Sequence, residues 1–289
     1  MIRKPAVAGQ FYAATRSACL AEIEECLSQQ PFSGDLPDPI VAGIVPHAGW
    51  VFSGRLAAMV FQAVRQVDGQ VDTFVLFGAA HRYYSGSPAV YDRGAWETPL
   101  GLAYIDEELA DQIVSLGALA SPNAHSGEHS IEVQVPFIQY LFPNARIVPI
   151  LMPLSGFEVP FGTAVGRLLA SLEDKQAVCI ASTDLTHYGP RYGFCPAGTG
   201  PSALAWAHQV NDREFIELAV RMEAEKIVPA ASEKQNACGP SAAAAVVAAA
   251  RAMGARRGVL LAHTSSNEVM LRKFRQRSEE SVGYAAIVF

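Results

Sequence analysis

Residues 40–67 read IVAGIVPHAGWVFSGRLAAMVFQAVRQV, and this stretch holds the two patterns that decide the fold. Its first part, Ile40–Val45, is a short apolar run that is typical of a buried strand. In Gly54–Val67, apolar residues recur every three or four positions and form one stripe along a helix. We therefore expect a strand that leads through a turn into a helix, with the helix packed on a sheet.

The same alternation continues along the rest of the chain. Further strands are predicted at Val71–Phe77, Arg146–Leu151, Ala177–Ala181, Gly258–Ala262 and Val282–Phe289. Further helices are predicted at Thr15–Gln29, Asp106–Leu116, Ser130–Phe142, Phe161–Leu172, Ala203–Arg221 and Pro240–Met253. Pro136 either kinks the helix that contains it or delays its start, and residues 188–201 are expected to form an irregular loop. Alternating strands and helices predict a layered α/β fold, and no linker or repeat divides residues 1–289, which predicts a single domain.

Composition excludes several classes of protein. Half of the residues are hydrophobic and 17% are charged, so the chain can bury a sizeable core. The 22 Lys and Arg residues against 28 Asp and Glu give a net charge of −6, which argues against nucleic acid as a partner. The longest apolar run, Ala242–Ala250, is far shorter than the ~20 residues that span a bilayer, so no membrane span is expected. Five cysteines do not describe a disulfide framework, and we expect a cytoplasmic protein.

Histidines follow four of the predicted strands. They are His47, His81, His187 and His263. Ligands of open α/β sheets bind beyond the carboxyl ends of the strands, where loops and helix starts converge. Cys238 directly precedes the predicted Ala-rich helix, and a helix N-terminus favours the thiolate form of a cysteine. We expect these five parts of the chain to meet at one place.

Three of these residues are the predicted metal ligands: His47, His81 and Cys238. Two imidazoles and one thiolate leave coordination positions open, as catalytic metal sites do. The alternative is that the three are unrelated, with His47 in a turn, His81 in a loop and Cys238 a small buried apolar residue.

Asp184 and His187 are the predicted catalytic pair. They lie three residues apart just after a strand, and a carboxylate beside an imidazole fixes its tautomer and makes it a suitable acid and base. The alternative is a turn capped by Asp184 with an exposed His187.

Four further residues are predicted to bind substrate. His129 and Glu132 are three apart, a spacing that points both side chains one way on a helix, and Trp50 and Arg82 lie next to predicted ligands. Tyr12 is expected in the same pocket. For the aromatic residues, simple packing is the alternative. Gly127, between His125 and His129, interrupts the pattern of a zinc-binding H-E-x-x-H helix.

Six separate motifs carry a resemblance to a known family. They are residues 3–12 (RKPAVAGQFY), 46–50 (PHAGW), 97–101 (ETPLG), 128–132 (EHSIE), 182–189 (STDLTHYG) and 238–239 (CG). At these positions the chain resembles a bacterial or archaeal member of the Memo family, found in the Amme-Memo-radical-SAM system. The resemblance implies the fold of class III extradiol ring-cleaving dioxygenases: a three-layer αβα sandwich around a mostly parallel or mixed sheet.

The resemblance also implies a metal. The related dioxygenases hold non-haem iron with two His and one Glu, and the similarity places the two imidazoles at His47 and His81. It implies Cys238 in place of the carboxylate, and His187 near the acid and base of the dioxygenases. Iron as Fe(II) is the implied cofactor, with copper or zinc as alternatives, since a thiolate also suits softer ions and is itself oxidisable.

Three hypotheses about function follow. The first is an Fe(II)-dependent redox enzyme of unknown substrate, in which Asp184 orients His187 for proton transfer. The second is a binding module that captures metal, a small molecule or a peptide without turnover, since animal Memo proteins are described as signalling adaptors. The third is a zinc hydrolase. The family resemblance also implies a partner from the radical-SAM system.

Overall fold

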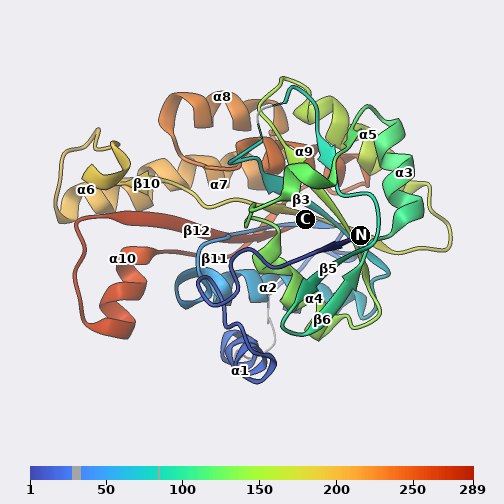
Figure 1. The fold of residues 1–289 in the computed structure, drawn as a ribbon. Helices are drawn as coiled ribbons and strands as arrows, with labels where there is room; N and C mark the ends of the chain where they lie inside the picture. The colour runs from blue at the N-terminus through green and yellow to red at the C-terminus, as the bar shows by residue number, and fades with distance from the viewer. Residues whose placement is uncertain (28–33, 84) are drawn as a thin grey trace.

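The computed structural model describes residues 1–27, 34–83 and 85–289, and their centre is a large mixed sheet (Figure 1). Within these residues the sheet has nine strands. Eight of them pair in the order β10-β12-β2-β9-β3-β8-β4-β7, and the ninth, β11, pairs with β12 on the edge that faces away from β2. The strands are β2 (Ala42–Val45), β3 (Thr73–Ala79), β4 (Ala89–Val90), β7 (Leu119–Ala120), β8 (Arg146–Met152), β9 (Ala177–Ser182), β10 (His187–Tyr188), β11 (Val259–Ser265) and β12 (Ser281–Val288).

The middle of the sheet is parallel. Strands β2, β9, β3 and β8 run in one direction as neighbours, and all residues of β2, β3 and β9 are buried. Strands covered on both faces read as continuous apolar runs, which explains the sequence pattern. The sheet is mixed because β12 runs antiparallel to β2 and β11, and β4 antiparallel to β8.

Helices cover both faces of this sheet (Figure 1). On one face, α9 (Pro240–Ala252) lies against β9, β3 and β2, with α5 (Glu158–Ala170) and α8 (Ala224–Lys234) packed on it. On the other face, α2 (Trp50–Asp68) lies against β12, β11 and β2, with α4 (Val135–Leu141) and α1 (Arg16–Leu27) packed outside it. The expected three-layer αβα sandwich is thereby confirmed.

The remaining elements lie around this core. A separate small sheet has the order β1-β5-β6. Its strands and the other helices are β1 (Ile2–Arg3), β5 (Ala95–Thr98), β6 (Gly101–Tyr104), α3 (Glu107–Ser115), α6 (Pro201–Trp206), α7 (Asp212–Val220) and α10 (Ser266–Val269). No helix in the described residues has the length and apolar character needed to cross a membrane.

Helices α5 and α9 pack unusually close together. A Cβ atom on Gly162 would lie 2.0 Å from the carbonyl oxygen of Ala245, and one on Gly166 would lie 2.3 Å from that of Ala249. Only glycine permits backbones to approach this closely. The alanine-rich sequence of α9 is therefore explained by its place: residues 242–250 are buried between the sheet and α5. This packing holds the start of α9 against the ends of the central strands.

The predicted strands are all confirmed, with bounds shifted by a few residues. The predicted helix Ser130–Phe142 is wrong in its first part: a 3₁₀ turn covers Glu132–Gln134 and α4 starts at Val135. Pro136 lacks the N–H that a helix interior requires, so it occupies the first turn of α4. The helix predicted from Thr15 is confirmed to Leu27, and its predicted end at Gln29 lies outside the described residues.

Other differences concern the second half of the chain. The predicted helix Ala203–Arg221 contains a π-helical turn, Ala207–Asn211, between α6 and α7. The expected loop 188–201 is wrong in part, because it includes the end of β10 and a 3₁₀ turn at Pro190–Tyr192. Helix α8 was not predicted, and it contains Pro229, which interrupts a helical pattern in sequence.

Candidate metal centre

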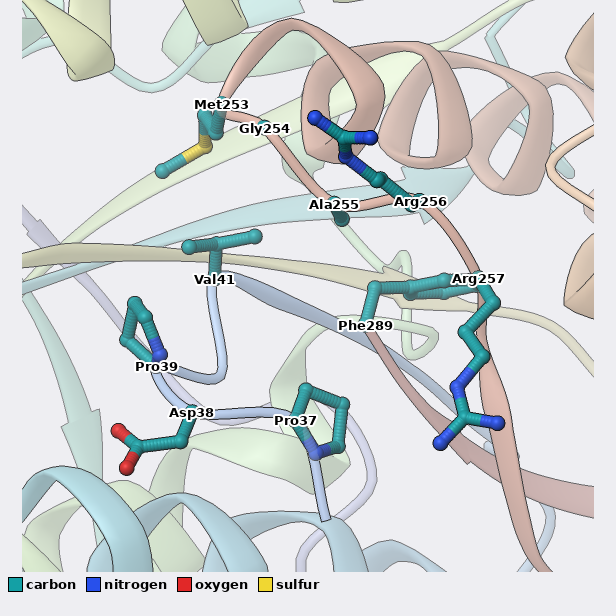
Figure 2. A pocket seen from close by; sticks show the side chains of 10 residues that line it. All are labelled: Pro37, Asp38, Pro39, Val41, Met253, Gly254, Ala255, Arg256, Arg257 and Phe289. Atoms are coloured by element: carbon teal, nitrogen blue, oxygen red, sulfur yellow. The ribbon is translucent and has the colours of Figure 1, made fainter. Parts of the chain in front are cut away.

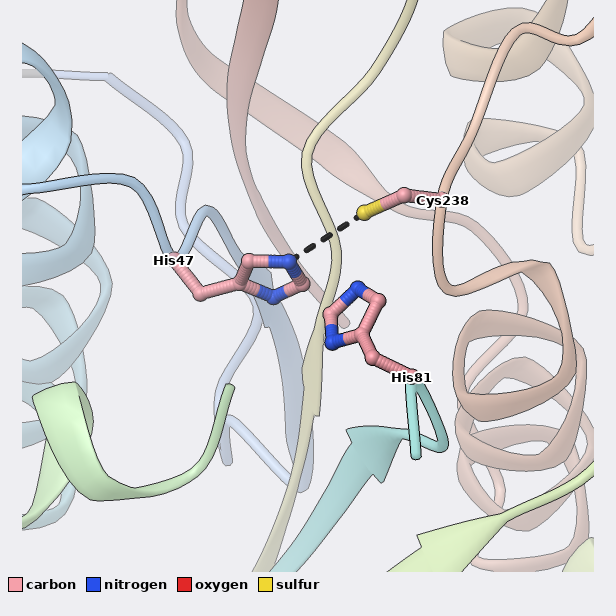
Figure 3. Close-up of side chains that lie close together, drawn as sticks. All are labelled: His47, His81 and Cys238. Carbon is pink, nitrogen blue, oxygen red and sulfur yellow. Dashed lines mark hydrogen bonds between the residues drawn. The ribbon is translucent and has the colours of Figure 1, made fainter. Parts of the chain in front are cut away.

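The predicted ligands come together where the central parallel strands end (Figure 3). Because β2, β9 and β3 are neighbours and run in one direction, the residues that follow them share one edge of the sheet. His47 follows β2 and His81 follows β3. Cys238 lies just before α9, which packs on these strands.

His47, His81 and Cys238 form a compact group. The Sγ atom of Cys238 lies 3.2 Å from Nε2 of His47, and the rings of His47 and His81 are 5.2 Å apart between centroids, edge to face. One ligand atom from each of the three residues lies within 4.8 Å of the others. The structure therefore brings together the three residues that the sequence analysis selected.

Each imidazole of this group is fixed through its Nδ1 atom. Nδ1 of His47 lies 3.1 Å from Oγ of Ser182, and Nδ1 of His81 lies 3.0 Å from Oε1 of Glu128. Metal-binding histidines are oriented in this way, with one ring nitrogen held by the protein and the other presented to the ion. The arrangement presents Nε2 of His47 to Cys238.

Glu128 is the functional residue that the sequence analysis missed. It is almost fully buried, and its carboxylate accepts hydrogen bonds from the backbone N–H groups of His81, His129 and Ser130 as well as contacting the His81 ring. Burial alone would raise its pKa, but the hydrogen bond and charge of His81 lower it to about 2. Glu128 thus supplies a fixed negative charge behind the His81 ring. Its signals in the sequence are its place beside His129 and its position as the first residue of the 128–132 motif.

Burial sets the protonation of the other ligands. Burial, with the neighbouring His81 and His129, lowers the pKa of His47 well below its usual value, so this ring is a neutral donor. Burial and the charge of Asp184 raise the pKa of the Cys238 thiol, against a smaller opposite effect of the Asp184 N–H that points to its sulfur. Burial thus opposes the thiolate form that the start of α9 is expected to favour, so this form needs a compensating positive charge beside the sulfur.

The donor set fits a metal ion. Neutral imidazole and sulfur are ligands for iron, copper and zinc, and a cation would supply the charge that a buried thiolate needs. His47 is 2% exposed, whereas the side chain of His81 is 31% exposed, so the group opens to solvent on one side. From that side an additional ligand could approach a bound ion.

His129 and Arg82 lie on this open side. The His129 ring stacks on His81 at 5.0 Å between centroids and meets His47 edge to face at 5.3 Å. The guanidinium of Arg82 is exposed beside Gly127, and its charge contributes to the lowered pKa of His129, for which burial is the largest cause. Both residues therefore lie beside the proposed ligands, and their role in binding a substrate stays a prediction.

Asp184 and His187 do not form the predicted pair. Oδ1 of Asp184 accepts hydrogen bonds from the backbone N–H groups of His47 at 2.7 Å and Ala48 at 3.3 Å. Nδ1 of His187 instead donates to the carbonyl oxygen of Leu185. The prediction that Asp184 orients His187 is therefore wrong, since the Asp184 carboxylate positions the turn that carries His47. Burial raises the pKa of Asp184 to about 7.

Trp50 and Glu132 do not face the site, contrary to prediction. Trp50 is buried, donates from Nε1 to the carbonyl oxygen of Val133, and packs between Tyr12 and Phe137. The carboxylate of Glu132 accepts hydrogen bonds from Arg3, from the backbone of Ala6 and Val7, and from the Tyr12 hydroxyl. Both are occupied in holding the N-terminal segment, so neither is available to a substrate.

His263 also lies elsewhere. Strand β12 separates β11 from β2, and His263 on β11 contacts Asp212 rather than the group around His47. The expectation that all four strand-end histidines meet is wrong for this residue.

A separate pocket of about 260 Å³ lies at the opposite end of the sheet (Figure 2). It is lined by the segment before β2, the residues after α9 and the last residue of the chain, including Val41, Arg256, Arg257 and Phe289. Since β2 runs from this pocket toward His47, the pocket is remote from the candidate metal centre.

Comparison with known proteins identifies relatives along the whole chain. A family model described as "Memo-like protein" matches residues 3–288. A MEMO1 family protein of Thermococcus onnurineus is 38% identical and one of Pyrococcus abyssi is 39% identical, each over 100% of this chain and 99% of the relative. Among solved structures, the uncharacterized protein JW3007 from Escherichia coli K12 is similar in fold, with a TM-score of 0.50 and 13% identity over 86% of this chain and 100% of that one. The chain therefore belongs to the Memo family.

Proposed function

We propose that this protein binds one transition-metal ion through His47, His81 and Cys238 and uses it in non-haem iron redox chemistry. The observation that carries the proposal is the convergence of two imidazoles, each fixed through Nδ1, with a thiol from a distant segment. A structural role alone does not require two imidazoles and a sulfur to converge where one side is open to solvent.

Iron, when bound, would supply a centre that changes oxidation state and accepts a further ligand. The surrounding residues fix the positions of the proposed ligands. Ser182 and Glu128 hold the two rings, and Asp184 holds the backbone at His47. Nδ1 of His187 donates to a carbonyl oxygen, so its Nε2 carries the lone pair and can take a proton from a substrate. His129 and Arg82 would contact a small-molecule or peptide ligand that enters from the open side.

Metal analysis of protein purified without oxygen tests the ligand set. We expect stoichiometric metal at this site in the native chain and one equivalent less in Cys238→Ser and His47→Ala. Cys195→Ser is the matched control, because Cys195 is a free, partly exposed thiol outside the group. Equal metal content in Cys238→Ser and Cys195→Ser would contradict the proposal.

Oxygen uptake tests the redox part. With iron restored and a panel of catechols supplied, we expect uptake above a blank that contains iron and catechol without protein. His187→Gln should reduce the uptake while leaving the iron content unchanged, since His187 is proposed to move a proton rather than to hold metal.

Non-catalytic metal binding is the second candidate, and one observation favours it. Trp50 and Glu132 are committed to internal contacts, so fewer side chains than expected are available to shape a substrate pocket. Full metal content without uptake on any catechol would support this candidate over the enzyme.

A reducing compartment such as the cytoplasm suits either function. Cys238 can bind metal only as a reduced sulfur, and all five cysteines of the chain are free.

A further inference from the structure

A second cluster of metal-ligating side chains lies apart from the centre described above. It consists of His208 on the π-helical turn, Asp212 at the start of α7 and His263 on β11. One ligand atom from each lies within 4.8 Å of the others. We propose that these three residues form a second site, which binds a divalent transition ion of the zinc type through two imidazoles and one carboxylate.

The carboxylate of Asp212 is held at the centre of this cluster. Its Oδ1 accepts the backbone N–H of Thr186 at 3.0 Å, and its Oδ2 lies 3.0 Å from Nε2 of His263. A Cβ atom on Gly283 would lie only 2.1 Å from Oδ2, so the carboxylate sits directly against the backbone of β12. The side chain of Asp212 is 2% exposed. One oxygen is thus committed to the backbone while the other is directed at the two histidines.

One ring nitrogen of His208 has no partner in this arrangement. Its Nδ1 atom is buried, has no hydrogen-bond partner and lies 4.0 Å from Oδ2 of Asp212, which is too long for a hydrogen bond. Buried polar atoms without a partner are rare in folded proteins because desolvation is not compensated. A cation between His208 Nδ1 and Asp212 Oδ2 would give Nδ1 the partner that it lacks.

The backbone and the rings place His208 correctly for this role. The π-helical turn brings His208 and Asp212, four residues apart, to the same face. Such turns often occur at functional sites. The rings of His208 and His263 stack at 3.9 Å between centroids with an angle of 16°, so both imidazoles lie beside the same carboxylate, and a rotation of the His208 ring out of the stack would direct both at one ion.

The cluster borders a pocket on the side of His263. A pocket of about 600 Å³ is lined by His263 and Glu268, together with Arg55, Arg272 and Arg275. Oε1 of Glu268 lies 3.7 Å from Nε2 of His208. The pocket provides a path by which an ion and a water or anion could reach the cluster.

The ligand chemistry distinguishes this site from the first. Two nitrogens and one oxygen suit Zn²⁺, Co²⁺ or Fe²⁺, whereas the sulfur of the first site also favours softer ions such as Cu(I). An ion here would join α7 to β11, and through Asp212 to the backbone of Thr186, which precedes His187. The second site would therefore brace the segment that carries His187.

Cobalt titration of the metal-free full chain without oxygen tests the proposal. We expect two equivalents of bound Co²⁺, one with the thiolate-to-cobalt charge-transfer band of a Cys238 ligand and one with ligand-field bands only. Cys238→Ser should abolish the charge-transfer band and keep the second equivalent. His208→Gln should do the reverse, and it removes no hydrogen bond of His208 Nδ1, since that atom has none.

A thermal-melting measurement complements the titration. In the Cys238→Ser background, Zn²⁺ should raise the melting temperature, and the additional His208→Gln or His263→Gln change should abolish that rise. Of the two, His208→Gln should leave the melting of the metal-free chain nearly unchanged, because His208 Nδ1 has no hydrogen-bond partner, whereas His263→Gln also removes the contact with Asp212. Binding of a single equivalent that always shows the charge-transfer band would overturn the second site while leaving the first intact. A rise that persists in both histidine variants would overturn it as well.

Discussion

Nδ1 of His81 lies 3.0 Å from Oε1 of Glu128, although 47 residues separate the two along the chain. The same carboxylate accepts the backbone N–H groups of His81, His129 and Ser130, so it fixes the loop after β3 as well as the ring. Glu128 therefore fixes both the ring and the backbone of His81, one of the proposed metal ligands.

Glu128→Gln should weaken metal binding without abolishing it. The amide can retain part of the hydrogen bonding but loses the negative charge behind His81, and changes of this kind typically cost about 10–100-fold in affinity. Competition with a chelator measures the affinity. Glu97→Gln is the control, since Glu97 pairs with Lys4 on the surface. Equal affinities of the two variants would show that Glu128 does not tune the site.

Asp184→Ala should destabilise the fold and also lower metal content. Two backbone N–H groups, at His47 and Ala48, lose their buried acceptor, which costs about 1–3 kcal/mol in the free energy of unfolding. Urea denaturation measures this cost. Asp111→Ala, which removes an exposed carboxylate, should change stability little. If the two variants unfolded alike, Asp184 would not hold the turn of His47.

Gly162→Ala should strongly destabilise the protein. The added methyl group would lie 2.0 Å from the carbonyl oxygen of Ala245, so α5 and α9 must move apart, at a cost of about 1–3 kcal/mol or more. Gly34→Ala is a control with the same chemical change at a position with open space. Thermal melting compares them, and a Gly162→Ala protein as stable as Gly34→Ala would refute the close packing.

Asp68→Asn should stabilise the protein at high pH. Burial raises the pKa of Asp68 to about 6. The hydrogen bond from the Ile40 N–H lowers this pKa in part, and the negative charge of Asp38 raises it further. Because the folded-state pKa lies above the unfolded value of about 3.9, ionised Asp68 costs stability above pH 6, and the cost disappears as the pH falls toward 4. The stability gain of Asp68→Asn over the native chain, measured by urea unfolding, should therefore be largest near pH 8 and vanish near pH 4. A gain that is constant with pH would contradict the raised pKa.

The sequence was sufficient to predict the architecture and the three proposed ligands. Short apolar runs that end in a turn and a polar residue mark the carboxyl ends of buried strands, and His47 and His81 both have that position. Cys238 was predictable because Gly239 and Pro240 mark the start of a helix. These signals are local, and the parallel strands bring them to one edge.

The directions of side chains were not predictable in the same way. Trp50 is three residues from His47, but it is the first residue of α2 and its ring turns into the core. His263 ends an apolar run as His81 does, but β12 lies between its strand and β2. Strand order depends on the whole fold, and so do long-range hydrogen bonds such as the one from the His47 N–H to Asp184. No local sequence pattern encodes them.

His47 and Cys238 lie 191 positions apart in the sequence, which has a consequence for how the protein would acquire the proposed ion. No short segment holds this donor set, so a growing polypeptide on the ribosome has nothing with which to capture the metal until its last third has been synthesised and folded. With the proposed ligand set, metal loading would follow folding, and the ion would add to the stability of the finished molecule without guiding its formation. A cell starved of metal would accumulate folded protein awaiting its ion.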